Sequence, residues 1–185
     1  GMARMGAIAY KDPDSAEKRV EAPTQSRVAR NVQLQVARSL DHDLIKGDIS
    51  GAFLQGDRDP GRHLYGVPPP DVLKMLNLPS NYVMEFLKQT YGLTTAPRGF
   101  FLKVFNDLKK PGWENMELDQ CTWVLRERDG SIIATCVMNV DDFIFTGNCS
   151  DIRFTKAMKK IRETFTFGEW KVNEFRQCGC DVRRD

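Results

Sequence analysis

At 185 residues, with 41% hydrophobic and 28% charged side chains, the chain has the composition of an ordinary globular protein rather than a disordered or fibrous one. Its formal net charge of +2 argues neither for nor against nucleic-acid binding, and no apolar run approaches the roughly 18 residues that cross a bilayer. The five cysteines follow neither a disulfide framework nor a zinc-ligand spacing, so they predict reduced thiols in an intracellular protein.

The first half of the chain predicts a helix, a buried strand and then a turn-rich segment. Thr24 or Ser26 can cap a helix whose apolar residues continue to Leu40. The strand that follows, 43–49, carries Asp48 near its end. Three short elements are expected next: strands over 64–67 and 83–87, and a helical turn over 71–76.

The second half predicts two longer helices and more strands. The helices are expected from Ala96-Pro97 to Pro111-Gly112 and over 151–165, where Ser150 is the cap. The expected strands are 122–128 and 131–138, joined at an Asp129-Gly130 hairpin turn, and a last strand over 174–182. Because strands and helices interleave without strict βαβ alternation, the pattern predicts an α+β fold: an antiparallel sheet with helices packed on one face.

The tetrapeptide Asn139-Val140-Asp141-Asp142 lies between two apolar runs that are typical of buried strands. Two adjacent carboxylates at a hairpin tip raise each other's pKa, so a cation usually accompanies such a pair. Asp48 has a similar strand setting, and neighbouring strands would make it a third carboxylate of one Mg²⁺ cage, completed by the Ile49 carbonyl. In two-metal phosphoryl transfer, Asp48 and Asp141 would bridge both ions while Asp142 assists. Taken alone, an Asp-Asp pair is more often a surface turn.

Three ordered segments resemble motifs of the reverse transcriptases of copia-type LTR retrotransposons. They are Gly47–Gly56, similar to the first acidic motif; Tyr91–Arg98, similar to Tyr-Gly-Leu-x-x-Ala-Pro-Arg; and Asn139–Asp142, similar to Tyr-Val-Asp-Asp. Two further segments, Phe167–Trp170 and Phe175–Gly179, resemble downstream segments of a divergent, protist-like branch. The departures from the pattern are Asn139 for Tyr, Thr94-Thr95 for Lys-Gln and Phe100 for Trp.

The resemblance implies a polymerase palm with partial fingers and no thumb, spanning 1–185. Within it, 1–42 would be partial fingers with a leading helix, and 43–185 the palm with a fingers segment inserted at about 57–95. It implies RNA- and DNA-directed DNA synthesis, a nucleotidyl transfer from dNTPs to a primer 3′-OH, with Mg²⁺ or Mn²⁺ as cofactor. Template-primer and dNTPs would be the partners, RNase H and integrase domains would lie outside this chain, and no membrane is involved. The expected location is a cytoplasmic retrotransposon particle, with the nucleus as the alternative.

The resemblance also gives roles to residues outside the carboxylates. Phe53 would lie beneath the incoming sugar and exclude a ribose 2′-hydroxyl, and its alternative role is core packing. Arg98 and Arg4 would bind the nucleotide, while Gly99 and Asn139 would contact primer or template. The alternative function is a catalytically inactive, decayed or repurposed retroelement piece that binds nucleic acid or protein. An unrelated α+β domain is the remaining possibility.

Overall fold

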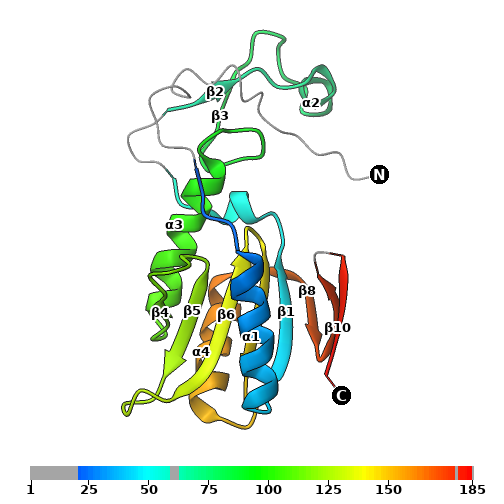
Figure 1. Ribbon diagram of the computed structural model, residues 1–185. Helices are drawn as coiled ribbons and strands as arrows, with labels where there is room; N and C mark the ends of the chain where they lie inside the picture. The colour runs from blue at the N-terminus through cyan, green and yellow to red at the C-terminus, as the bar shows by residue number, and fades with distance from the viewer. Residues whose placement is uncertain (1–20, 59–62, 178, 185) are drawn as a thin grey trace. The chain divides into compact units, whose positions relative to one another are not determined.

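The computed structural model describes residues 21–58, 63–177 and 179–184 (Figure 1). The chain divides into two compact units. The first contains Phe53–Phe100 together with Glu21, and the second contains Ala22–Ala52 and the chain from Phe101 onward. Arg4, expected from the sequence to bind nucleotide, lies outside the described residues.

A six-stranded antiparallel sheet is the centre of the second unit, with the strand order β4-β5-β6-β7-β1-β8. Its strands are β1 (Asp43–Ile49), β4 (Glu114–Asn115), β5 (Thr122–Arg126), β6 (Ile132–Asn139), β7 (Asp142–Gly147) and β8 (Phe167–Val172). β6 and β7 form a hairpin, and β1 pairs with β7 on one side and with β8 on the other. The end of β1 therefore lies beside the tip of the β6–β7 hairpin.

Helix α1 (Arg27–Ser39) covers one face of this sheet. The Ser26 side chain caps it by accepting a hydrogen bond from the Ala29 N–H. The helix turns Ala37 into a cluster with Leu44 of β1 and Ile144 of β7. Gln33, also buried, donates from Nε2 to the Ile144 carbonyl at 2.8 Å, which satisfies a polar group that burial would otherwise leave unpaired.

Helices α3 (Ala96–Lys109) and α4 (Ile152–Thr164) meet the side chains of the opposite face. The Phe105 ring of α3 lies 5.2 Å from the Trp123 ring of β5, and the Phe154 ring of α4 packs over Gly147 of β7. Figure 1 shows α1 and α4 on opposite sides of the sheet. The prediction that helices pack on one face of the sheet only was therefore wrong, because α1 also has an apolar face that must be buried against the sheet.

A short hairpin of β9 (Glu174–Gln177) and β10 (Cys180–Arg183) follows β8. The sequence predicted one strand over 174–182, and this is wrong because the chain reverses at Gly179, whose φ of +78° is easily adopted by glycine. Phe175 of β9 and Val182 of β10 pack against the Leu44–Ile144 cluster, on the same face as α1.

The 3₁₀ helix η2 (Ala52–Gln55) crosses the boundary between the units, and its residues from Phe53 onward belong to the first unit. The first unit also contains the helix α2 (Pro70–Met75), the first turn of α3, and the strand β2 (Tyr65–Gly66), which pairs with β3 (Met84–Glu85). It includes the segment of about 57–95 that the sequence marked as an insertion. In the described parts of the chain, no helix is both long enough and apolar enough to cross a membrane.

Candidate functional site

The candidate site is built on the turn between β6 and β7. Asn139 pairs with Asp142, so Val140 and Asp141 alone make the turn. Val140 has a φ of +60°, a conformation that is strained for a β-branched side chain. The Ile49 N–H donates to the Asp141 carbonyl at 2.8 Å, and this bond fixes the end of β1 against the turn.

The strand register brings two predicted catalytic residues face to face. Asp48 of β1 is the direct partner of Asp142 of β7, and side chains of directly opposite residues project from the same face of a sheet, roughly 5 Å apart at Cβ. Burial, and next the negative charge of Asp141, raise the pKa of Asp48, while Lys46 acts in the opposite direction. The three aspartates therefore share one electrostatic environment.

The pKa of Asp142 is strongly perturbed. Burial raises its pKa to about 6; Lys46 and Gln177 oppose this rise, and Asp48 and Asp141 add to it. Its Oδ1 is buried and accepts no hydrogen bond from any described residue, and the amide of Gln177 is likewise without a hydrogen-bond partner there. The Gln177 amide therefore favours the carboxylate of Asp142 as a dipole and not through a hydrogen bond.

Lys46, which the sequence reasoning missed, provides the positive charge. Its side chain is 13% exposed, and Nζ lies 2.7 Å from Glu169 Oε2 and 3.9 Å from Asp142 Oδ1. Nζ also donates to the Arg176 carbonyl at 3.1 Å. Burial opposes the charge, but the hydrogen bond to Glu169 and the field of Asp142 leave the pKa of Lys46 raised.

Glu169 of β8 completes this charged group and was also missed. It is the second register partner of Asp48. Hydrogen bonds from Lys171 and then from Lys46 hold the pKa of Glu169 at about 2. The signal for Lys46 was present in the sequence: it precedes Asp48 by two residues, and alternate residues of a strand share a face.

These residues fit a hard divalent cation in their chemistry and only partly in their grouping. Asp48 and Asp142 offer carboxylate oxygens on one face, and the buried Asp142 Oδ1, which accepts no hydrogen bond from the described residues, is the type of atom that a cation would satisfy. In the described chain, no three His, Cys, Asp or Glu side chains are grouped closely enough to hold one metal ion. The three-carboxylate cage and the Ile49 carbonyl ligand therefore stay predictions.

Three other predicted residues belong to the first unit. The Phe53 ring lies 4.8 Å from the Tyr91 ring and 6.3 Å from the Phe100 ring, so it takes part in an aromatic cluster. Arg98 donates from Nη1 to the Glu21 carbonyl at 3.2 Å. A Cβ at Gly99 would lie 3.2 Å from the Gln89 side chain, so a larger residue here requires Gln89 to shift by a few tenths of an ångström.

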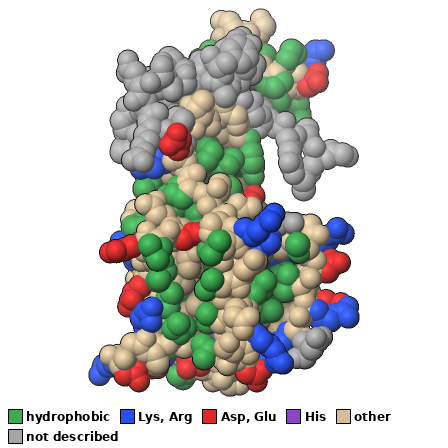
Figure 2. All heavy atoms as spheres, viewed as in Figure 1, with side chains coloured by type: hydrophobic (Ala, Val, Ile, Leu, Met, Phe, Trp, Pro, Cys, Tyr) green, Lys and Arg blue, Asp and Glu red, His purple; other side chains and the backbone are tan. Residues whose placement is uncertain are grey.

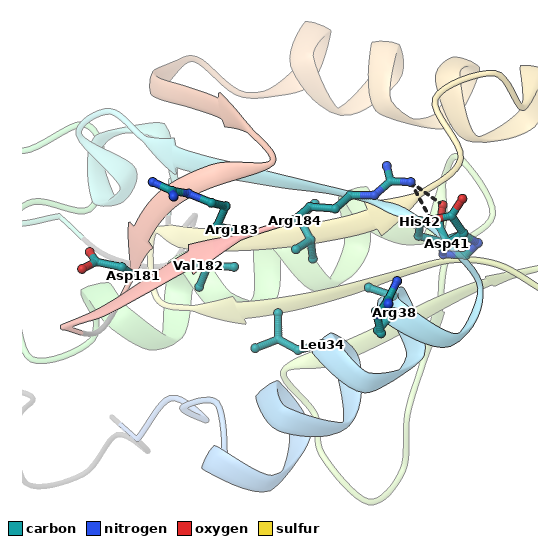
Figure 3. Close-up of a pocket in the computed structure, with 10 residues that line it drawn as sticks. Leu34, Arg38, Asp41, His42, Asp181, Val182, Arg183 and Arg184 are labelled. Atoms are coloured by element: carbon teal, nitrogen blue, oxygen red, sulfur yellow. Dashed lines mark hydrogen bonds and ion pairs between the residues drawn. The ribbon is translucent and has the colours of Figure 1, made fainter.

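A separate cleft of about 330 Å³ opens between α1 and β10 in the second unit (Figure 3). Leu34 and Val182 are among its apolar lining residues. At one end the Arg184 guanidinium forms ion pairs with Asp41 and Asp43. None of the predicted site residues lines this cleft. Figure 2 shows apolar and charged side chains intermingled on the face of the second unit where α1 lies.

Comparison with known proteins shows similarity to two retrotransposon polyproteins. The chain is 31% identical over 127 residues to the retrovirus-related Pol polyprotein from transposon RE1 of Arabidopsis thaliana, and 32% identical over 127 residues to that from transposon RE2. The chain resembles a region of a retrotransposon Pol polyprotein. Each match covers 69% of this chain and 8% of the polyprotein, so the Pol-like region spans a small part of its relatives. No family model matches the chain. No solved structure matches it either.

Proposed function

We propose that this Pol-like region is the palm, with part of the fingers, of a copia-like reverse transcriptase. The observation that carries the proposal is the register of Asp48 against Asp142, with Asp141 in the turn beside them. The similarity to retrotransposon Pol polyproteins and the order of the three motifs support it. In this proposal 43–185 is the palm, with a fingers segment of about 57–95 inserted into it, and 1–42 precedes it as partial fingers.

In the proposed reaction a primer 3′-OH attacks the α-phosphate of a dNTP. Asp48, Asp141 and Asp142 would hold Mg²⁺ or Mn²⁺, which supplies an activated 3′-oxygen and charge stabilisation for the departing pyrophosphate. The chain presents Asp48 and Asp142 on one face of the sheet. Phe53 would exclude a ribose 2′-hydroxyl by steric contact, and Arg98 would bind phosphate.

Primer extension with dNTPs and Mg²⁺ or Mn²⁺ tests the proposal, on this chain and on a chain extended on both sides within the polyprotein. Asp48→Asn and Asp141→Asn are expected to lower the rate at least about a thousandfold, because each removes a ligand charge from the reacting centre. Asp71→Asn is the matched control, since Asp71 is an exposed aspartate of α2 in the first unit. Extension that survives Asp48→Asn would contradict the proposal.

A second readout concerns the sugar. Phe53→Ala is expected to let ribonucleotides in while dNTP incorporation persists, because the ring would no longer occupy the space of the 2′-hydroxyl. The contacts of Phe53 with Tyr91 and Phe100 also fit a packing role. Unchanged ribonucleotide exclusion in a folded Phe53→Ala protein would assign the ring to packing alone.

The second candidate is an inactive retroelement piece that binds nucleic acid or protein. The observation that favours it is the lack of a three-ligand metal group in the described residues, together with Asn139 at the position next to the acidic pair. It predicts no primer extension by the extended chain with either metal. It also predicts that replacing Asp48 leaves nucleic-acid binding unchanged, because binding would not depend on the carboxylates.

A further inference from the structure

A lysine ammonium lies among the carboxylates of the candidate site. Lys46 Nζ is 2.7 Å from Glu169 Oε2 and 3.9 Å from Asp142 Oδ1, and its side chain is 13% exposed. Asp48 follows two residues later on the same face of β1. A nearly buried ammonium so close to two carboxylates compensates their charge far more effectively than a surface lysine would, because solvent screens it less.

We propose that Lys46 is a built-in counter-cation of this centre, which stabilises the metal-free protein and competes with a divalent ion for Asp142. The inference rests on the proposed function, because it takes the aspartates to be metal ligands. Lys46 is then a positioning residue: it acts on the metal through the carboxylate that it holds. Asp142 Oδ1 has Lys46 as its ion-pair partner and accepts no hydrogen bond from the described chain, so a divalent ion at this oxygen meets the ammonium directly.

The charges around the site give the direction of the effect. Asp48, Asp141, Asp142 and Glu169 bring four carboxylates to one end of the sheet. Lys46 offsets one of these charges, so its removal leaves a more negative site for a cation. A unit charge about 5 Å from a bound divalent ion changes the affinity by about tenfold even at the dielectric constant of water, and by more where solvent is excluded. Lys46→Met is therefore expected to bind Mn²⁺ about tenfold more tightly.

Lys171 provides a matched control. Its Nζ lies 2.7 Å from Glu169 Oε1, so it contacts the same glutamate as Lys46, but its side chain is 52% exposed. No ion pair joins it to Asp142 within the described residues. Lys171→Met removes the same charge from the same neighbourhood without releasing Asp142. Its Mn²⁺ affinity is expected to stay within about twofold of the wild-type value, because solvent screens an exposed charge.

The experiment is a titration with Mn²⁺ followed by electron paramagnetic resonance, on the 185-residue chain without nucleic acid. The proteins are wild type, Lys46→Met, Lys46→Gln, Lys46→Arg, Lys171→Met and Asp48→Asn. Lys46→Gln keeps a donor for the Arg176 carbonyl and serves if Lys46→Met does not fold, as judged by circular dichroism. Lys46→Arg keeps the charge, so its affinity is expected to match wild type. The midpoint of thermal unfolding without metal is expected to fall in Lys46→Met and to recover in part with Mn²⁺.

The outcomes separate this inference from the proposed function. Tighter Mn²⁺ binding in the Met or Gln variant, with Arg and Lys171→Met like wild type, supports the counter-cation. If Asp48→Asn abolishes Mn²⁺ binding but Lys46→Met binds Mn²⁺ as tightly as wild type or more weakly, the counter-cation role of Lys46 is overturned. The metal site itself is then retained. An absence of Mn²⁺ binding in every protein overturns both.

Discussion

The raised pKa of Asp142 makes a sharp prediction about stability and pH. Its pKa in the folded protein is about 6, against 3.8 for the free side chain. A carboxyl group whose folded pKa lies above its unfolded pKa binds protons more tightly in the native state. The free energy of unfolding therefore falls as the pH rises through this window, and it levels off above about pH 6. Asp142→Asn removes this titration and leaves a neutral side chain of the same shape.

The magnitude follows from the size of the shift. About two pKa units at 1.36 kcal/mol each give an upper limit of about 3 kcal/mol, of which roughly 2 kcal/mol falls between pH 4.5 and pH 8. The side chain of Asp142 is 20% exposed, so only modest screening reduces this figure. Asp142→Asn is therefore expected to gain about 2 kcal/mol relative to wild type over this pH range.

Urea unfolding of wild type and Asp142→Asn, in metal-free buffer at half-unit steps of pH, measures the difference. The comparison between the two proteins cancels the titration of groups that do not interact with Asp142; Asp48 is coupled to Asp142, so its titration is part of the measured difference. Asp71→Asn, a substitution in an exposed turn of α2, is expected to follow wild type at every pH. A difference between wild type and Asp142→Asn that stays constant with pH, or that shrinks as the pH rises, would refute the argument that burial governs this carboxyl group.

Three further substitutions test the packing and the backbone around the site. Val140→Gly is expected to stabilise the chain by about 1 kcal/mol in thermal or urea unfolding, because glycine adopts the φ of +60° without strain; a loss of stability would contradict this. Gly47→Ala is expected to destabilise by about 1–3 kcal/mol, since its Cβ would lie 2.8 Å from the Phe167 ring. Thr135→Val is expected to destabilise by about 1–2 kcal/mol, because the Thr135 and Thr146 hydroxyls are 2.8 Å apart in the wild type and the change leaves the buried Thr146 hydroxyl unpaired. Replacing both threonines by valine should recover part of this loss, and strictly additive effects of the two changes would argue against the pairing.

The sequence was informative where local chemistry decides the structure. Asp129-Gly130 predicted a hairpin, and the chain turns there with Gly130 at a φ of +90°. The Asn139–Asp142 tip was expected between two strands, and β6 and β7 flank it. Ser26 was one of the two caps expected for the first helix, and it is the residue that caps α1, whereas Ser150 was a wrong prediction for α4 because Asp151 caps that helix. Each of these depends on residues that are neighbours in the chain, so a local pattern is enough to predict them.

The sequence was less informative where distant segments meet. Nothing local specifies that β1 is inserted between β7 and β8, although this places Glu169 as well as Asp142 opposite Asp48. The polar Gln33 is on the buried face of α1 because a carbonyl of β7 accepts its hydrogen bond, while Val28, an apolar residue of the same helix, stays 71% exposed. Such pairings depend on tertiary structure, which overrides the apolar pattern of a single helix.

The energetic costs at the β6–β7 turn bear on which of the two candidate functions holds. A valine has a positive φ, the buried Asp142 Oδ1 accepts no hydrogen bond from the described chain, and Asp141 adds a like charge beside it. A glycine at 140 or an asparagine at 142 would relieve strain or charge with a single change. A protein that only binds a partner through other surfaces does not require the strained valine or the clustered carboxylates. A centre that must present carboxylates to a cation requires the negative charge, and a rigid turn holds the carboxylates in place. The local energetics therefore favour the catalytic proposal over the inactive alternative, and the metal titration of the Lys46 variants measures the charge on which this argument depends.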